Sequence, residues 1–113
     1  MRREEKILVV EDNPAIVQAM EQQFNCDCAT DGWDAIEKLE TREYAAIVID
    51  ADVPRHSGYG VLTYLREEVG GELPNVIFMT SSDRDEILRR VGGRLHVVSK
   101  ADALAEVTRV LDS

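Results

Sequence analysis

Short apolar runs recur along the chain, and each has the length of a buried β-strand. Most are continuous rather than alternating with polar residues, which is typical of parallel strands covered on both faces; Cys26–Thr30, which contains Asp27, is the weaker signal. The expected strands are Ile7–Val10, Cys26–Thr30, Ala45–Ile49, Val76–Met79 and Leu95–Ser99.

Amphipathic helical patterns fill the gaps between these strands. Their apolar positions, helix by helix, are Ile16, Met20 and Phe24; Ala35, Ile36 and Leu39; Val61, Leu62, Leu65 and Val69; Ile87, Leu88 and Val91; and Leu104, Val107 and Leu111. Asn13-Pro14 has the residues of a helix start, and Asp83-x-x-Glu86 has the spacing of a capping box. Gly pairs at 70–71 and 92–93 are expected to end the third and fourth helices.

Strict alternation of strands and helices predicts an α/β fold with a parallel five-stranded sheet and right-handed crossovers. The pattern contains no repeat and no linker. We therefore expect a single (βα)5 domain over residues 1–113, with no effector domain in this chain.

Composition narrows the range of functions. The 113 residues include 13 Lys+Arg against 22 Asp+Glu, a formal charge of −9. This excess argues against direct binding to nucleic acid or to an anionic membrane surface. No apolar run approaches the ~20 residues of a membrane span, the N-terminus does not resemble a signal peptide, and two cysteines are too few for a disulfide framework. We expect a cytoplasmic protein, monomeric or weakly dimeric.

Acidic and polar residues follow the expected strands. Glu11 and Asp12 follow the first strand, Asp50 and Asp52 the third, Thr80 the fourth and Lys100 the fifth. Because ligands bind beyond the carboxyl ends of parallel strands, these residues should share one site.

Four neighbouring carboxylates repel one another unless a cation lies between them. Mg²⁺ (or Mn²⁺) suits such ligands, and together with Lys and Thr it can stabilise the oxygens of a transferring phosphoryl group. An aspartate in this setting can act as a nucleophile and form an aspartyl phosphate.

The chain resembles the receiver domain of bacterial two-component response regulators over essentially its whole length. The resemblance rests on four motifs in order: Leu8-Val9-Val10-Glu11-Asp12-Asn13, Asp50-x-x-x-Pro54-x-x-x-Gly58, Met79-Thr80-Ser81 and Ser99-Lys100.

The resemblance implies a doubly wound, flavodoxin-like fold with strand order 2-1-3-4-5 and helices on both faces. It implies that Asp50 accepts a phosphoryl group, with Thr80 and Lys100 contacting that group. Glu11, Asp12, Asp50 and the backbone carbonyl of Asp52 would hold the metal. The donor would be the phosphohistidine of a histidine kinase or phosphotransfer protein, or a small molecule such as acetyl phosphate.

Three positions depart from the family pattern. Ala101 replaces a proline that is often cis, Val97 replaces the Tyr or Phe that moves inward on activation, and Asp52 replaces an apolar or amide residue. The segments 12–50 and 80–100 are also a few residues short, which should trim the loop near Asn25 and the fourth helix.

Two other functions compete with a working receiver. The departures at Val97 and Ala101 allow a pseudo-receiver that binds partners without phosphate. Asp50-Ala51-Asp52 also resembles the nucleophile motif of haloacid-dehalogenase-type phosphatases, although that motif usually lies on the first strand.

The resemblance also points to an output surface. In the family it is formed by the fourth helix, the fifth strand and the fifth helix. Here that face would present a locally basic cluster toward a downstream protein partner, which the sequence does not identify. That face includes Arg89, Arg90, Arg94, His96 and Val97, and ordinary solvated arginines are the alternative interpretation.

Overall fold

The computed structural model describes residues 5–52, 58–68, 73, 75–81, 83–91 and 96–112. Within them the order of elements is β1 (Ile7–Val10), α1 (Pro14–Gln23), β2 (Cys26–Ala29), α2 (Gly32–Thr41), β3 (Ala46–Asp50), α3 (Gly58–Glu68), β4 (Val76–Thr80), α4 (Arg84–Val91), β5 (His96–Ser99), the short 3-10 helix η1 (Lys100–Asp102) and α5 (Ala103–Leu111).

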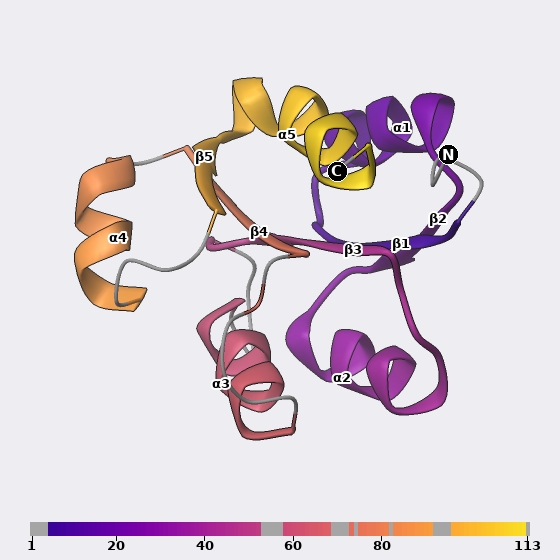
Figure 1. Cartoon of the computed structure of the whole chain (residues 1–113), viewed down its shortest axis with the longest axis horizontal. Coiled ribbons are helices and arrows are strands. Elements are labelled where there is room, and N and C mark those ends of the chain that lie inside the picture. Colours follow the sequence, from indigo (N-terminus) through magenta and orange to yellow (C-terminus); the bar gives the residue numbers. More distant parts are fainter. Residues whose placement is uncertain are drawn as a thin grey trace.

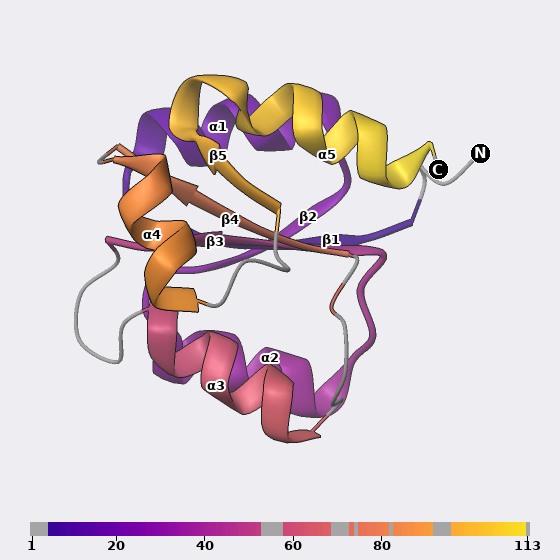
Figure 2. The ribbon, with the colours of Figure 1, turned by 60° about the vertical axis from the view of Figure 1, so that its left-hand side comes forward.

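The five strands form one parallel sheet in the order β2-β1-β3-β4-β5. Helices α1 and α5 cover one face, α2 and α3 cover the other, and α4 lies beside β5 (Figures 1 and 2). The predicted fold class and strand order are therefore confirmed.

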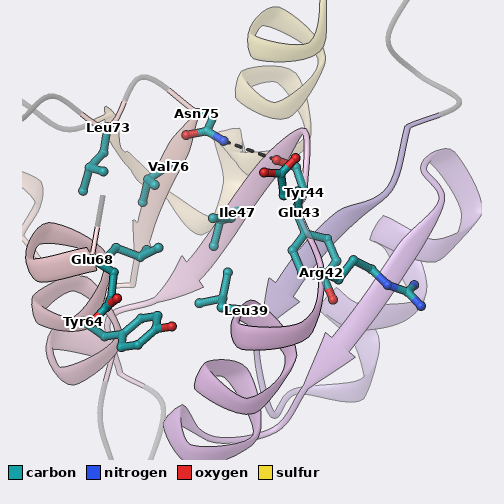
Figure 3. Close-up of a pocket in the computed structure, with 11 residues that line it drawn as sticks. Leu39, Arg42, Glu43, Tyr44, Ile47, Tyr64, Glu68, Leu73, Asn75 and Val76 are labelled. Atoms are coloured by element: carbon teal, nitrogen blue, oxygen red, sulfur yellow. Dashed lines mark hydrogen bonds between the residues drawn. The ribbon is translucent and has the colours of Figure 1, made fainter. Parts of the chain in front are cut away.

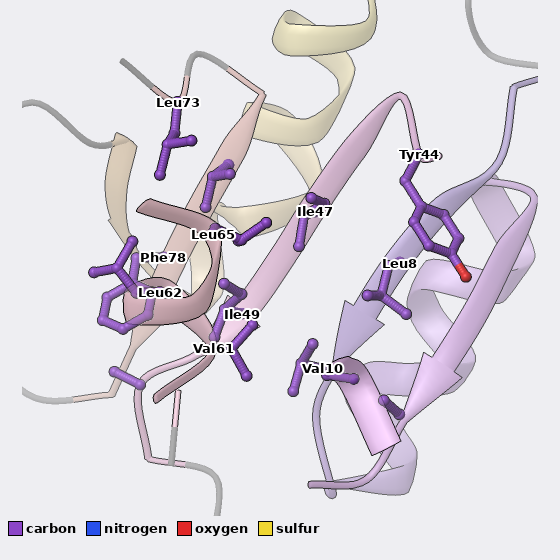
Figure 4. Close-up of a cluster of buried hydrophobic side chains, with 14 of the residues drawn as sticks. Leu8, Val10, Tyr44, Ile47, Ile49, Val61, Leu62, Leu65, Leu73 and Phe78 are labelled. Carbon is purple, nitrogen blue, oxygen red and sulfur yellow. The ribbon is translucent and has the colours of Figure 1, made fainter. Parts of the chain in front are cut away.

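Alternation along each strand divides the core into two clusters, because successive strand side chains point to opposite faces. In β1, Leu8 and Val10 pack in the cluster beneath α2 and α3 (Figure 4), whereas Ile7 and Val9 pack in the cluster beneath α1 and α5. Both faces of the central strands are thus buried, as the continuous apolar runs predicted.

Side-chain caps fix where several helices begin. Asn13 Oδ1 accepts a hydrogen bond from the amide of Ala15, and Pro14 occupies the first turn, as predicted. Asp31 caps α2 through the amide of Asp34. Asp83 accepts a hydrogen bond from the amide of Asp85, so it caps α4, which at eight residues is the shortest α-helix described.

Several element ends differ from the sequence-based expectation. β2 ends at Ala29, one residue early, while β3 and β4 each extend one residue further, to Asp50 and Thr80. The parallel register explains the extension, since Asp50 pairs with Met79 and Thr80 pairs with Ser99. The glycine pairs, Val69 and Leu95 lie outside the described residues.

The edge strand β2 carries a charged hub at Asp27. Its carboxylate accepts hydrogen bonds from Tyr44 Oη at 2.8 Å and Arg42 at 3.0 Å, and Lys6 Nζ lies 3.3 Å away. Burial alone would raise the pKa of Asp27, but these hydrogen bonds and positive charges hold it below its usual value. The hub ties β2 to the segments before β1 and β3.

Every helix within the described residues is too short or too polar to cross a lipid bilayer.

Candidate functional site

The carboxyl ends of β1, β3, β4 and β5 bring the predicted site residues to one edge of the sheet. Asp50 and Thr80 are the last residues of β3 and β4, and both are buried. Glu11 directly follows β1, and Lys100 directly follows β5. Residues 50 apart in sequence therefore come into contact.

Asp50 lies at the centre of this edge, with 1% of its surface exposed. One carboxylate oxygen, Oδ2, accepts a hydrogen bond from Lys100 Nζ at 3.0 Å. The other, Oδ1, accepts one from the backbone amide of Asp52 at 2.9 Å. Burial works against the charge of Lys100, but its hydrogen bond to Asp50 and the charges of Asp50 and Glu11 raise its pKa above the usual value.

Glu11 is fully buried beside Asp50. Its Oε1 accepts hydrogen bonds from the amides of Asp12 and Asn13, each at 3.0 Å. Its Oε2 lies 3.5 Å from Lys100 Nζ and accepts no hydrogen bond from the described residues. Burial, together with the nearby Asp50 carboxyl, raises the pKa of Glu11 to about 7.

The donor set fits a hard divalent cation. Carboxylate oxygens of Glu11, Asp12 and Asp50 all lie within 4.8 Å of one another. Asp12 is exposed at the opening, while the other two are buried. A cation bound among these carboxylates would compensate the buried oxygen of Glu11 that accepts no hydrogen bond, and it would favour the charged form of this carboxyl group, whose pKa is raised. The solvent-facing carboxylate of Asp12 would serve as the third ligand.

Gly58 holds α3 against the backbone of the site. A Cβ at this position would lie 2.6 Å from the carbonyl oxygen of Asp50 and 2.9 Å from Ile49 Cγ2. Only glycine permits so close an approach. This close contact explains why position 58 of the family motif is a glycine in this chain. Pro54 of the same motif lies outside the described residues.

Asp52 and Ser81 join two loops across the rim of the site. Both residues are exposed, and Ser81 Oγ donates a hydrogen bond to Asp52 Oδ2 at 3.1 Å. The side chain of Asp52 thus turns to the loop after β4, while its amide contacts Asp50. The backbone carbonyl of Asp52 remains a predicted metal ligand.

Three contacts near the site do not follow from the sequence analysis. The Tyr59 ring packs edge-on against Phe78, with centroids 5.3 Å apart, and the Arg90 guanidinium lies 4.4 Å from the Tyr59 centroid. Arg84 Nε donates a 2.8 Å hydrogen bond to the carbonyl of Val97. No local sequence signal identifies such contacts, because each joins elements that are remote in the chain.

The predicted output surface is only partly exposed. Arg89 and Arg90 are exposed on α4, whereas Val97 is buried in the core. His96 is half-buried and its Nδ1 lies 2.8 Å from Glu106 Oε2 of α5. Arg94 lies outside the described residues. Among the described residues, the exposed arginines of this cluster therefore lie on α4, whereas Val97 of β5 belongs to the hydrophobic core.

The parallel sheet has the order β2-β1-β3-β4-β5, and buried carboxylates paired with a lysine lie at the carboxyl ends of its strands. These features define a class of proteins, the flavodoxin-like receivers. The chain matches the response regulator receiver domain family over residues 7–109 and belongs to that family. It is thus a receiver domain of the kind found in two-component systems.

Curated relatives agree with this assignment. The chain is 33% identical over 115 residues to the transcriptional activator protein IrlR of Burkholderia pseudomallei, covering 93% of this chain and 48% of that protein. It is 34% identical over 84 residues to the transcriptional regulatory protein DltR of Streptococcus agalactiae, covering 70% of this chain and 37% of that protein. The chain spans less than half the length of these relatives.

Solved structures agree on the fold. The receiver domain of the Francisella response regulator 1452 superposes with a TM-score of 0.78 at 22% identity, over 96% of this chain and 97% of that one. The receiver domain of the sensor histidine kinase PA1611 from Pseudomonas aeruginosa PAO1 superposes with a TM-score of 0.74 at 25% identity, over 97% and 99%. That structure holds a magnesium ion coordinated in its active-site cleft.

Proposed function

We propose that the chain is a phosphorylatable receiver in which Asp50 is the phosphoacceptor. The observation that carries this proposal is the buried Asp50 carboxylate, paired with Lys100 at 3.0 Å and flanked by Glu11 at the carboxyl edge of the sheet. We interpret residues 1–113 as one such domain.

The proposed reaction is a single displacement at phosphorus. A carboxylate oxygen of Asp50 attacks, the P–N bond of a phosphohistidine or the P–O bond of acetyl phosphate breaks, and an acyl phosphate forms. The leaving imidazole or acetate keeps the bonding electron pair. Attack by water on the same phosphorus later returns Asp50 to its carboxylate form.

Each neighbour has a part that follows from its position. The Lys100 ammonium, already held by Asp50, would balance the added negative charge. The Thr80 hydroxyl, at the end of the adjacent strand, would donate a hydrogen bond to a phosphoryl oxygen. Thr80 ends β4, the strand beside β3, and Lys100 follows β5, one strand further, from where its ammonium already reaches Asp50.

Glu11, Asp12, Asp50 and the backbone carbonyl of Asp52 would hold Mg²⁺ or Mn²⁺. The bound cation supplies neutralisation of the carboxylates and of the phosphoryl oxygens during transfer. The close carboxylates and the buried Oε2 of Glu11 support this assignment.

The test is the intact mass of the protein after incubation with acetyl phosphate and Mg²⁺. We expect wild type to gain one phosphoryl group, and Asp50→Ala to gain none. Asp85→Ala, which removes an exposed aspartate from α4, is the matched control and should label like wild type. Labelling of Asp50→Ala, or equal labelling in excess chelator, would contradict the proposal.

A folded wild type that binds Mg²⁺ but takes no phosphoryl group from acetyl phosphate or from a phosphohistidine donor would favour the pseudo-receiver. Val97 and Ala101 are the observations behind that alternative. Steady turnover of p-nitrophenyl phosphate would instead favour a phosphatase that uses Asp50 and Asp52.

For output we propose the surface of α4 that carries Arg89 and Arg90, meeting an acidic protein partner. The Arg84 hydrogen bond to the Val97 carbonyl and the Arg90 contact with Tyr59 connect this helix to β5 and α3. These contacts give α4 a link to the site that does not need an aromatic residue at Val97.

A further inference from the structure

A cavity of about 370 Å³ opens between α2 and α3, at the amino ends of β3 and β4 (Figure 3). Asp50 and Thr80 stand at the opposite ends of the same two strands. None of the described residues that line the cavity belongs to the acidic site. It is therefore a separate feature of the fold, and its volume is within the range of small-molecule sites.

The inner wall of the cavity is apolar. Ile47, Leu65, Leu73 and Val76 are buried there, and Leu39 closes the α2 side. Such a wall favours the hydrocarbon part of a ligand, since burying apolar surface stabilises a complex.

Two glutamates stand at the mouth of the cavity. Glu43 and Glu68 are exposed on different walls, one before β3 and one at the end of α3, and neither makes an ion pair with any described residue. Arg42 also lines the cavity, but its guanidinium binds Asp27 at 3.0 Å and extends away from Ile47 and Leu39 in Figure 3.

Tyr64 at the same mouth reports this charge. Burial raises the pKa of Tyr64, and the negative charges of Glu40 and Glu68 raise it further. The negative charges near this ring are complementary to a cation.

We propose that this cavity binds a small organic ammonium ion, with its hydrocarbon body against Ile47 and Val76 and its charged group at the mouth lined by Glu43 and Glu68. The site is independent of phosphoryl transfer at Asp50. Both the apolar wall and the acidic mouth are needed, because the first fixes the body and the second selects the charge.

The test uses three probes of similar shape on the ¹⁵N-labelled full chain: 2-phenylethylammonium, neutral 2-phenylethanol and 3-phenylpropionate. Amide shifts should concentrate at Ile47, Leu65 and Val76. We expect the ammonium probe to bind about fivefold more tightly than the alcohol, a factor suited to exposed charge pairs. The carboxylate probe should bind most weakly.

Variants separate the two parts of the site. Glu43→Gln with Glu68→Gln should abolish the preference for the cation and leave the affinity for the alcohol unchanged. Glu21→Gln with Glu86→Gln removes the same charge from α1 and α4 and should keep the preference. Leu39→Phe should weaken all three probes by filling the cavity.

Three results would overturn the proposal: equal affinities for the three probes, shifts that map to other residues, or no shift at these amides up to the solubility limit. Spectra of each variant without probe establish that it is folded, so a lost preference reports on charge rather than on stability.

Discussion

Replacing Gly58 by alanine tests how tightly α3 is held against the phosphoacceptor strand. The new Cβ would lie 2.6 Å from the Asp50 carbonyl oxygen, 2.9 Å from Ile49 Cγ2 and 3.3 Å from Ala51 Cα. Two of the three neighbours are backbone atoms, which cannot turn aside as a flexible side chain can. The helix start, the strand end or both must move by roughly half an ångström.

Overpacking usually costs about 1–3 kcal/mol. Alanine recovers at most about 1 kcal/mol of helix propensity over glycine, and less at the first residue of a helix. We therefore expect Gly58→Ala to lower the free energy of unfolding by a net of about 0.5–2.5 kcal/mol, a fall in Tm of roughly 2–10 °C. Urea unfolding and thermal melts, each followed by circular dichroism, measure it.

The same substitution should slow labelling by acetyl phosphate, since the carbonyl that moves belongs to Asp50. Thr63→Ala, an exposed change on the same helix, is the control and should leave both stability and labelling near wild type. A Gly58→Ala protein that melts at or above the wild-type temperature would refute the reasoning, because the close approach would then cost nothing.

Three further predictions concern single side chains. Because burial raises the pKa of Glu11 to about 7, its protonation stabilises the metal-free fold at low pH. That contribution is lost as pH rises from about 4.5 through about 7, so the free energy of unfolding of wild type in chelator should fall by about 3 kcal/mol over this range. Glu11→Gln should not show this fall. Urea unfolding measures both proteins, and parallel pH profiles would contradict the prediction. Asp52→Asn should speed labelling by acetyl phosphate by up to about fivefold, since it removes one exposed charge that repels the donor, and unchanged rates would argue against this role. Tyr59→Phe should match or exceed wild-type stability by up to about 1 kcal/mol, because the buried hydroxyl has no hydrogen-bond partner among the described residues; a lower Tm would mean that it has one.

Most of the fold could be predicted because its signals are local. The apolar runs around Val9 and Val48 are buried on both faces, and Asn13-Pro14 begins a helix as its composition indicates. The apolar pattern predicts ends for β3 and β4 that are one residue early, because Asp50 and Thr80 are polar. Pairing with neighbouring strands, which local composition does not reveal, keeps both residues in the sheet.

The sequence predicts which residues lie together in the site, because the carboxyl ends of parallel strands are at the same edge of the sheet. The contact of Lys100 with Asp50 follows from that rule. The full burial of Glu11, the Arg84 hydrogen bond and the packing of Arg90 on Tyr59 do not. They depend on how particular side chains pack between elements, and the sequence contains no short-range signal for that.

The charged hub at Asp27 bears on how the protein behaves at high concentration. β2 is an edge strand, and an open edge can pair with a strand of another molecule and seed aggregation. Charged residues on an edge strand disfavour such pairing. Asp27, with Lys6 and Arg42 beside it, places such charges on β2. We therefore expect the hub to disfavour self-association along this edge, in addition to its role of anchoring β2 within the molecule.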